Sequence, residues 1–109
     1  MLYSMDLEKF KQRLKGYKKE DIIFTSHAEI QALMRQIDLE EVKENIVNPE
    51  KLVYIEEELK NSNSEKYGCY FAYEEYHCHK YVLALNRKVI IVTIININRN
   101  WQKIIEGKK

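Results

Sequence analysis

The chain has 109 residues, enough for one domain with a hydrophobic core but not for two. Eighteen Lys and Arg balance 17 Asp and Glu, so the net charge of +1 identifies no partner. No apolar stretch approaches the roughly 18 residues of a membrane span. The N-terminus lacks a signal-peptide segment, and the two cysteines form no disulfide framework. We therefore expect a cytoplasmic protein without membrane contact. Many Ile, Lys, Glu and Tyr with short connections suit a thermophile.

The first quarter of the chain predicts a helix and then a short strand. Apolar residues at helical spacing mark the helix, which Gly16 helps to end: Leu7, Phe10, Leu14 and Tyr17. Residues 22–25 are short and β-branched, which is typical of a brief strand.

Two capped helices are predicted next, over residues 26–36 and 38–47. Ser26 with Glu29, and Asp38 with Glu41, have the spacing of a capping box, in which two side chains satisfy free N–H groups at a helix start. Asn48-Pro49 ends the second helix. Each helix has one apolar face that we expect to be buried: Ile30, Leu33, Met34 and Ile37 in the first, Leu39, Val42 and Ile46 in the second.

The second half of the chain predicts strands. Residues 51–59, 67–73, 80–85 and 89–98 are strand segments, and residues 61–65 are the clearest loop. The last three strands have hairpin-length connections, which make them antiparallel neighbours. The strand at 89–97 is apolar on both faces and is expected to lie centrally under helices. Helices followed by a strand meander make the fold class α+β, as one domain over residues 1–109.

The residues Thr25-Ser26-His27-Ala28, then Arg35, Ile37 and Asn48-Pro49-Glu50, resemble an uncharacterised domain family with the pattern T-x-H-A-x-x-R-M-x-x-R-G-I followed by N-P and a strand meander. That family is grouped with the RelE/ParE toxin superfamily, which also holds the BrnT-type toxins. The resemblance spans residues 22–97 and implies a RelE/ParE-like fold. This sequence departs from the pattern at three positions, where it has Gln31, Ala32 and Gln36 in place of arginine, methionine and glycine.

The resemblance implies a toxin-like protein of a type II toxin–antitoxin system, with an antitoxin as partner. Its implied activity is that of a ribosome-associated RNA endonuclease that needs no metal and no cofactor. Such an enzyme uses a base for the 2′-hydroxyl, cations on the phosphate and an acid for the leaving group. The alternative is a non-catalytic module of the same fold that binds nucleic acid or protein, which the missing arginine favours.

Two residues match the family pattern and are carried over as catalytic candidates, His27 and Arg35. At a helix start, the positive end of the helix dipole favours a neutral histidine ring, which can act as a base or an acceptor. The alternative for His27 is a structural hydrogen bond that fixes the helix start. Arg35 either clamps a phosphate with its planar guanidinium or pairs with a helix carboxylate such as Glu40.

The cluster His77-Cys78-His79, with Cys69 upstream, has the chemistry of a zinc site, but its spacing does not. On a strand, His77 and His79 share one face while Cys78 points to the other. We therefore predict no metal site, and interpret the segment as a polar turn. Most of the tyrosines, among them Tyr73 and Tyr81, fall on strands, where they either stack on bases or simply pack.

Basic residues near strand ends are the candidate RNA-binding set: Lys80, Arg87, Lys88, Arg99 and Lys103. Trp101 is the candidate partner-binding residue, because an aromatic beside Arg99 at a strand end is typical of an interface centre for an antitoxin or a second copy in a homodimer. The alternative is that Trp101, Ile104 and Ile105 fold back onto the chain's own core as a helical turn.

Overall fold

The computed structural model describes residues 3–60 and 65–108. In chain order the elements are α1 (Tyr3–Lys15), a 3-10 turn, β1 (Ile22–Phe24), α2 (Ser26–Met34), α3 (Leu39–Val47), a second 3-10 turn (Pro49–Lys51), β2 (Leu52–Lys60), β3 (Glu65–Glu74), β4 (His77–Leu85), β5 (Val89–Ile97) and α4 (Trp101–Glu106). The α+β class and the order of the elements are as predicted. Of the predicted loop at 61–65, residues 61–64 lie outside the described residues, and Glu65 begins β3.

The five strands form one mixed sheet in the order β1-β5-β4-β3-β2. The antiparallel meander of β3, β4 and β5 is confirmed. The expected central place of β5 is wrong, because β4 takes the centre and β5 lies one strand from the edge. Its second neighbour is β1, which pairs in parallel over only three residues, Ile22–Phe24 against Val89–Ile91. This pairing joins segments far apart in the chain.

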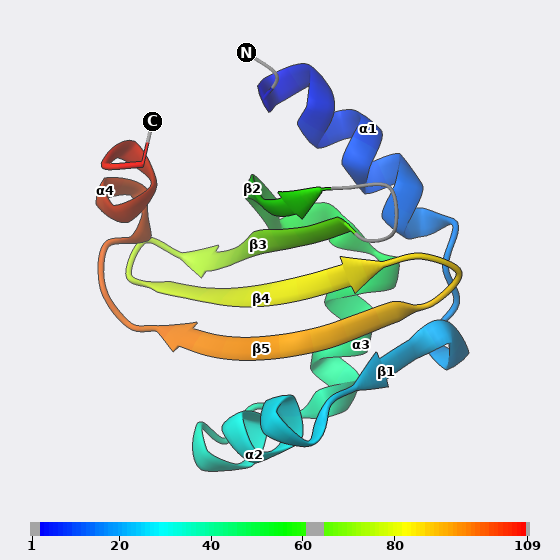
Figure 1. The fold of residues 1–109 in the computed structure, drawn as a ribbon. Coiled ribbons are helices and arrows are strands. Elements are labelled where there is room, and N and C mark those ends of the chain that lie inside the picture. Colours follow the sequence, from blue (N-terminus) through cyan, green and yellow to red (C-terminus); the bar gives the residue numbers. More distant parts are fainter. Residues whose placement is uncertain (1–2, 61–64, 109) are drawn as a thin grey trace.

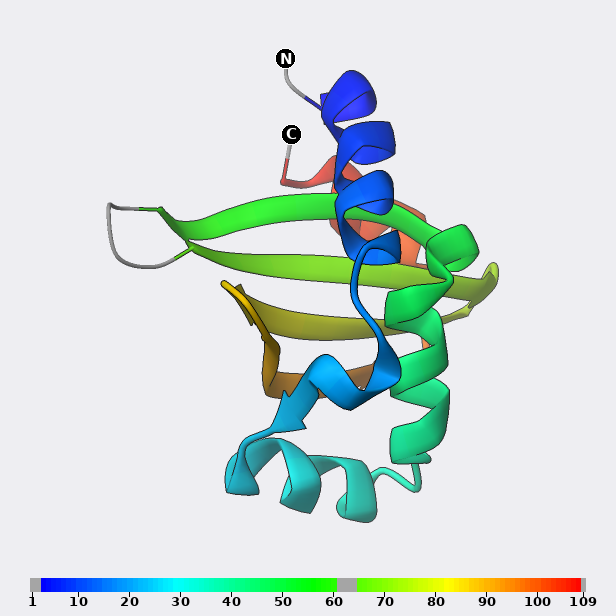
Figure 2. The ribbon, with the colours of Figure 1, turned by 90° about the vertical axis from the view of Figure 1, so that its right-hand side faces the viewer.

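Helices α1 and α3 pack on one face of the sheet, and the short α4 lies on the opposite face at one end of the strands (Figures 1 and 2). Helix α2 lies beyond the β1–β5 edge of the sheet rather than over a face (Figures 1 and 2). The main core therefore forms between the α1–α3 layer and the sheet. Fully buried side chains from both layers fill it, including Leu14, Val42, Ile46, Leu83 and Ile91.

The position of α2 reverses most of the burial that its sequence predicts, and of the four apolar residues only Ile37, beyond the end of the helix, is buried as expected. Ile30, Leu33 and Met34 are 56%, 79% and 73% exposed, whereas Ala28 and Ala32 are buried. At a sheet edge the small alanine side chains let the helix approach the strand closely. Gln31, on the same side, accepts a hydrogen bond from the Ile94 N–H of β5 at 2.8 Å. The helix thus covers part of an open strand edge and leaves its large apolar side chains outside.

The two predicted helix caps differ in outcome. Asp38 caps α3 as expected, with its carboxylate accepting from the Glu40 N–H at 2.9 Å. The cap of α2 is Thr25 rather than Ser26, since the Thr25 hydroxyl accepts from the Ala28 N–H at 3.1 Å. Glu41 does not complete a capping box and instead accepts a hydrogen bond from the sheet, as described below.

The end of α2 forms a Schellman motif around Gln36. The Ile37 N–H donates to the Ala32 carbonyl at 2.9 Å, and the Gln36 N–H donates to the Leu33 carbonyl at 3.2 Å. Gln36 has φ 55°, and among the described residues it is the one non-glycine residue with positive φ. This left-handed position is also where the family pattern resembled above has glycine.

We expect Gln36→Gly to stabilise the protein by about 1 kcal/mol, because glycine adopts positive φ without the steric cost that a side chain brings. Gln12→Gly is the matched control. Gln12 is exposed within α1, where glycine costs roughly 1 kcal/mol. Chemical denaturation of both variants measures the two free energies of unfolding. A loss of stability at Gln36→Gly would contradict the left-handed conformation.

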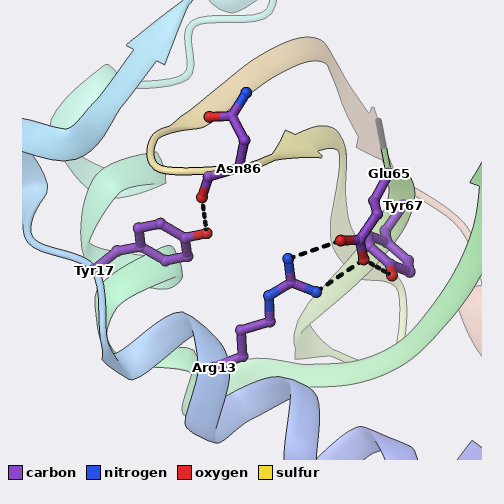
Figure 3. Close-up of polar contacts among 5 residues, drawn as sticks. All are labelled: Arg13, Tyr17, Glu65, Tyr67 and Asn86. Carbon is purple, nitrogen blue, oxygen red and sulfur yellow. Dashed lines mark hydrogen bonds and ion pairs between the residues drawn. The ribbon is translucent and has the colours of Figure 1, made fainter. Parts of the chain in front are cut away.

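Helix α1 is fastened to the sheet by polar contacts far from α2 (Figure 3). The Arg13 guanidinium donates to both carboxylate oxygens of Glu65, at 3.0 and 3.2 Å, and the Tyr67 hydroxyl donates to the same carboxylate at 2.6 Å. Nearby, the Tyr17 hydroxyl donates to the Asn86 carbonyl in the β4–β5 turn at 2.6 Å. These contacts orient α1 across the strands.

Among the described residues, no helix has the length and apolar character needed to span a membrane.

Candidate functional site

A polar cluster lies at the end of the sheet where β3 turns into β4. We call it the histidine–tyrosine cluster, and its members come from α3, β3 and β4: Glu41, Asn45, Tyr73, His77, His79 and Tyr81. The predicted polar turn at 77–79 is wrong, because His77, Cys78 and His79 belong to β4 and the turn contains only residues 75–76.

Strand and helix periodicity bring these side chains together. His77, His79 and Tyr81 alternate along β4 and therefore share the face that α3 covers. Glu41 and Asn45 are four residues apart on α3 and so share one side of that helix. The predicted alternation of His77 and His79 against Cys78 is thereby confirmed, since Cys78 is buried on the other face with Tyr70 and Ile105.

Tyr73 joins the cluster through an irregularity in the sheet. Ala72 pairs with Cys78 and Glu74 pairs with His77, which leaves Tyr73 as an extra residue without a partner in β4. Such a β-bulge bends the strand and redirects the side chain of the extra residue. The Tyr73 ring consequently stacks on His77, with 5.0 Å between ring centres, and meets His79 edge-on at 4.7 Å.

Hydrogen bonds link α3 to the buried histidine in a continuous chain. The Tyr73 hydroxyl donates to Glu41 at 2.5 Å, and the Asn45 amide nitrogen donates to the hydroxyl oxygens of Tyr73 at 2.7 Å and Tyr81 at 3.0 Å. The Tyr81 hydroxyl is hydrogen-bonded to His79 Nδ1 at 2.8 Å. The His79 ring is therefore held in one orientation by a network that begins on a helix.

His77 is held by a side chain of the neighbouring strand β5. Its Nε2 is hydrogen-bonded to Asn96 Oδ1 of β5 at 3.1 Å, and its ring centre lies 5.4 Å from that of His79. Each imidazole thus has one ring nitrogen fixed by a side chain. Lys51 places its ammonium group 5.4 Å from the centre of the Tyr73 ring, so a cation lies beside this member of the cluster.

The second nitrogen of each ring remains available. His79 Nε2 and His77 Nδ1 have no hydrogen-bond partner among the described residues. In the same part of the chain, no fully buried side-chain nitrogen or oxygen lacks a partner. Both nitrogens therefore touch solvent, even though His79 as a whole is only 3% exposed. The protein therefore orients two imidazoles, each with one ring nitrogen that no described side chain or backbone group occupies.

Burial controls protonation in the cluster. Desolvation lowers the pKa of His79, an effect that the Glu41 carboxylate opposes and His77 reinforces, so the ring is neutral at pH 7. Because the folded state favours the neutral ring, stability is lost as pH falls below 6.5 through this lowered pKa. Burial raises the pKa of Tyr73 to about 12 and that of Tyr81 still further, which keeps both hydroxyls protonated.

We expect the protein to lose stability steeply between pH 10 and 12. Burial raises the pKa values of Tyr67, Tyr70 and Tyr73 from 10 to about 12. In this range the folded state binds more protons than the unfolded state, so the free energy of unfolding falls as pH rises. Denaturation series at pH 9, 10, 11 and 12 measure the slope. A free energy that stays constant to pH 12 would contradict the burial of these hydroxyls.

The two predicted catalytic residues lie outside this cluster and apart from each other. His27 is exposed at the start of α2, and Arg35 is the residue that ends the same helix. Eight residues of helix separate them by about 12 Å. The Arg35 guanidinium is 3.5 Å from the carbonyl of Gln31 in its own helix.

The five predicted RNA-binding residues do not form one patch. Arg87 and Lys88 lie in the β4–β5 turn, about 26 Å along the nine-residue strand from the histidine end, and Lys88 pairs with Asp21 at 3.3 Å. Lys80 lies on the opposite face of β4 from His79 and pairs with Glu56 at 3.0 Å. Arg99 and Lys103 are exposed after β5 and lie at the histidine end of the sheet.

Trp101, the predicted partner-binding residue, starts α4 and packs back on the chain's own sheet. Its indole N–H donates to the Glu74 carbonyl at 2.6 Å, and its ring lies against the cluster of Tyr70, Cys78 and Ile105. The structure thus has the second of the two arrangements considered above, and the predicted helical turn is α4.

Sequence reasoning missed Asn45 and misassigned Glu41, which it placed in a capping box. The detectable signal was the alternation of His77, His79 and Tyr81, three polar side chains on one face of a strand.

Among the described residues, no group of three or more His, Cys, Asp and Glu is arranged to hold a metal ion. No family model, curated protein or solved structure matches the chain.

Proposed function

We propose that the protein is a toxin-like RNA endonuclease of a type II toxin–antitoxin system, with a RelE/ParE-like fold and a metal-independent active site at the histidine–tyrosine cluster. The observation that carries the proposal is the pair of imidazoles, His77 and His79. Each has one ring nitrogen held by a side chain, and the other has no hydrogen-bond partner among the described residues and touches solvent.

This arrangement suits acid–base chemistry on a phosphodiester. Cleavage of RNA without a metal requires a group that removes the 2′-hydroxyl proton and groups that stabilise the negative charge on the phosphate. A neutral imidazole can accept that proton, while Lys51 beside Tyr73 and the solvent-exposed Arg99 can supply positive charge. The proposal moves the catalytic role from His27 and Arg35 to residues that lie together.

Gln36 supports the resemblance to the toxin superfamily. The family pattern has glycine at this position, and the backbone of this chain adopts there the left-handed conformation that favours glycine. The matched residues His27 and Ala28 begin α2, and Asn48-Pro49 ends α3, so the motif covers one continuous helical pair. These residues thereby acquire a structural role in the α2–α3 hairpin.

A second candidate function is protein binding without catalysis, by a module with the same fold. The exposed apolar face of α2, formed by Ile30, Leu33 and Met34, favours this alternative, because contiguous exposed apolar side chains often mark interaction sites. An antitoxin is the partner that the toxin proposal itself requires.

The test uses the purified protein and a labelled single-stranded RNA, either alone in a buffer that contains a chelator or with ribosomes in a magnesium buffer without one. We expect cleavage products that end in a 2′,3′-cyclic phosphate, no cleavage of DNA with the same sequence, and arrested growth on expression. Intact RNA in both conditions, together with normal growth, would refute the nuclease and favour the binding module. Cleavage of the RNA alone that the chelator abolishes would refute the metal-independent mechanism.

A further inference from the structure

The hydrogen bonds around Tyr81 define where the proton of His79 lies. The Asn45 amide nitrogen can only donate, and it donates to both tyrosine oxygens. Tyr73 gives its own proton to the Glu41 carboxylate, which can only accept. The Tyr81 oxygen accepts from Asn45, and its hydroxyl proton has two acceptors within reach, the Tyr73 oxygen and His79 Nδ1. The Tyr73 oxygen already accepts from Asn45, which favours His79 Nδ1, at 2.8 Å, as the acceptor of the Tyr81 proton. A neutral His79 then carries its proton on Nε2, the nitrogen that touches solvent.

The same reasoning gives His77 the opposite character at its open nitrogen. The Asn96 side-chain oxygen is an acceptor, so the His77 Nε2 that faces it at 3.1 Å carries the proton. A neutral His77 therefore has a lone pair on Nδ1. Two rings with centres 5.4 Å apart thus present unlike groups, an N–H donor on His79 and an acceptor on His77.

We propose that the chain of hydrogen bonds from Glu41 to Tyr81 fixes the donor–acceptor polarity of the histidine pair, and that the site consequently selects ligands with a hydroxyl group beside an anionic oxygen. In this proposal Asn45 and Tyr81 are positioning residues, because Tyr81 is hydrogen-bonded to the His79 ring and Asn45 acts on that ring through Tyr81. The choice of RNA as the substrate rests on the proposed function. In RNA, the selected groups are the ribose 2′-hydroxyl and the adjacent phosphate.

The polarity assigns one role to each ring in the cleavage step. The 2′-hydroxyl proton moves to His77 Nδ1 as the 2′-oxygen attacks phosphorus, and the bond from phosphorus to the 5′-oxygen breaks. The departing oxygen takes a proton from water, and His77 later releases its proton to solvent. His79 Nε2–H donates to a phosphate oxygen throughout, as a preorganised stabiliser of negative charge.

The tautomer is tested directly by ¹⁵N NMR of the imidazole rings in the wild-type protein near pH 8. We expect the His79 proton on Nε2, and a shift toward a mixture of tautomers in Tyr81→Phe, which removes the donor to Nδ1. Tyr76→Phe is the matched control, since Tyr76 is exposed in the adjacent turn, and it should leave the spectrum unchanged. A wild-type His79 with its proton on Nδ1 would overturn the proposal without any variant.

Ligand selection is tested with a ribonucleoside 3′-monophosphate and its 2′-deoxy counterpart. We expect the deoxy form to bind about tenfold more weakly, through the loss of the hydrogen bond to His77, and His77→Phe to remove that difference. Equal affinities, or no measurable binding of either nucleotide, would overturn the selection of hydroxyl-bearing ligands. Both measurements are independent of whether polymeric RNA is cut, so failure of the proposed nuclease is a separate result.

Discussion

Replacing His77 by glutamine is expected to lower the rate of RNA cleavage by about 10²–10⁴-fold, the usual contribution of a positioned acid–base group. Glutamine retains a hydrogen-bonding side chain but has no titratable nitrogen. His77 is partly exposed, so the substitution should leave the fold intact. His79→Gln should have a smaller effect on rate, because glutamine keeps an N–H donor, and should also lower the melting temperature, because this ring is buried.

His27→Gln is the matched control for both variants. His27 is exposed and has no hydrogen bond to the rest of the described chain, so we expect wild-type activity and stability. Initial rates on one labelled RNA, with circular dichroism on the same samples, separate loss of chemistry from loss of folding. If His27→Gln abolished cleavage while His77→Gln retained it, the active site would lie at α2 and the cluster would be structural.

Ile46→Ala is expected to destabilise the protein by about 2–5 kcal/mol, the usual cost of truncating a fully buried aliphatic side chain. Ile46 has no exposed surface and lies on the face of α3 that packs into the core. Leu33→Ala is the comparison on α2, where the side chain is 79% exposed. We expect a change within about 0.5 kcal/mol there, as for most surface substitutions.

Urea denaturation of the two variants measures both free energies of unfolding. Together they test which helix contributes its large apolar side chains to the core. A loss at Leu33→Ala comparable to that at Ile46→Ala would contradict the exposed face of α2 and restore the burial that its sequence predicts.

Local sequence signals predicted most of the elements but not all of their surroundings. Signals that depend on a few neighbouring residues predicted elements that are present. They include the α3 cap at Asp38, the helix end at Asn48-Pro49 and the hairpin-length links between the last three strands. The apolar spacing of Ile30, Leu33 and Met34 predicts a helix with one apolar face. This spacing does not indicate whether the helix packs on a face of the sheet or at its edge.

Long-range pairing explains the remaining differences. The parallel contact of β1 with β5 joins residues 67 positions apart, and no local pattern encodes it. The bulge that turns Tyr73 toward the histidines depends on the register of β3 against β4. Glu41 has the sequence spacing of a capping box, yet its carboxylate contacts Tyr73 because the sheet places that hydroxyl within reach. The candidate site is therefore a product of the tertiary fold.

The most direct test of the proposed site is a titration of RNA into His77→Gln, observed through the ring resonances of the other two histidines. The chain has three histidines, so only His27 and His79 remain in this variant. Binding at the histidine–tyrosine cluster predicts that the His79 signals shift with RNA concentration while those of His27 stay in place. Shifts confined to His27, or no shift of either ring at saturating RNA, would contradict it.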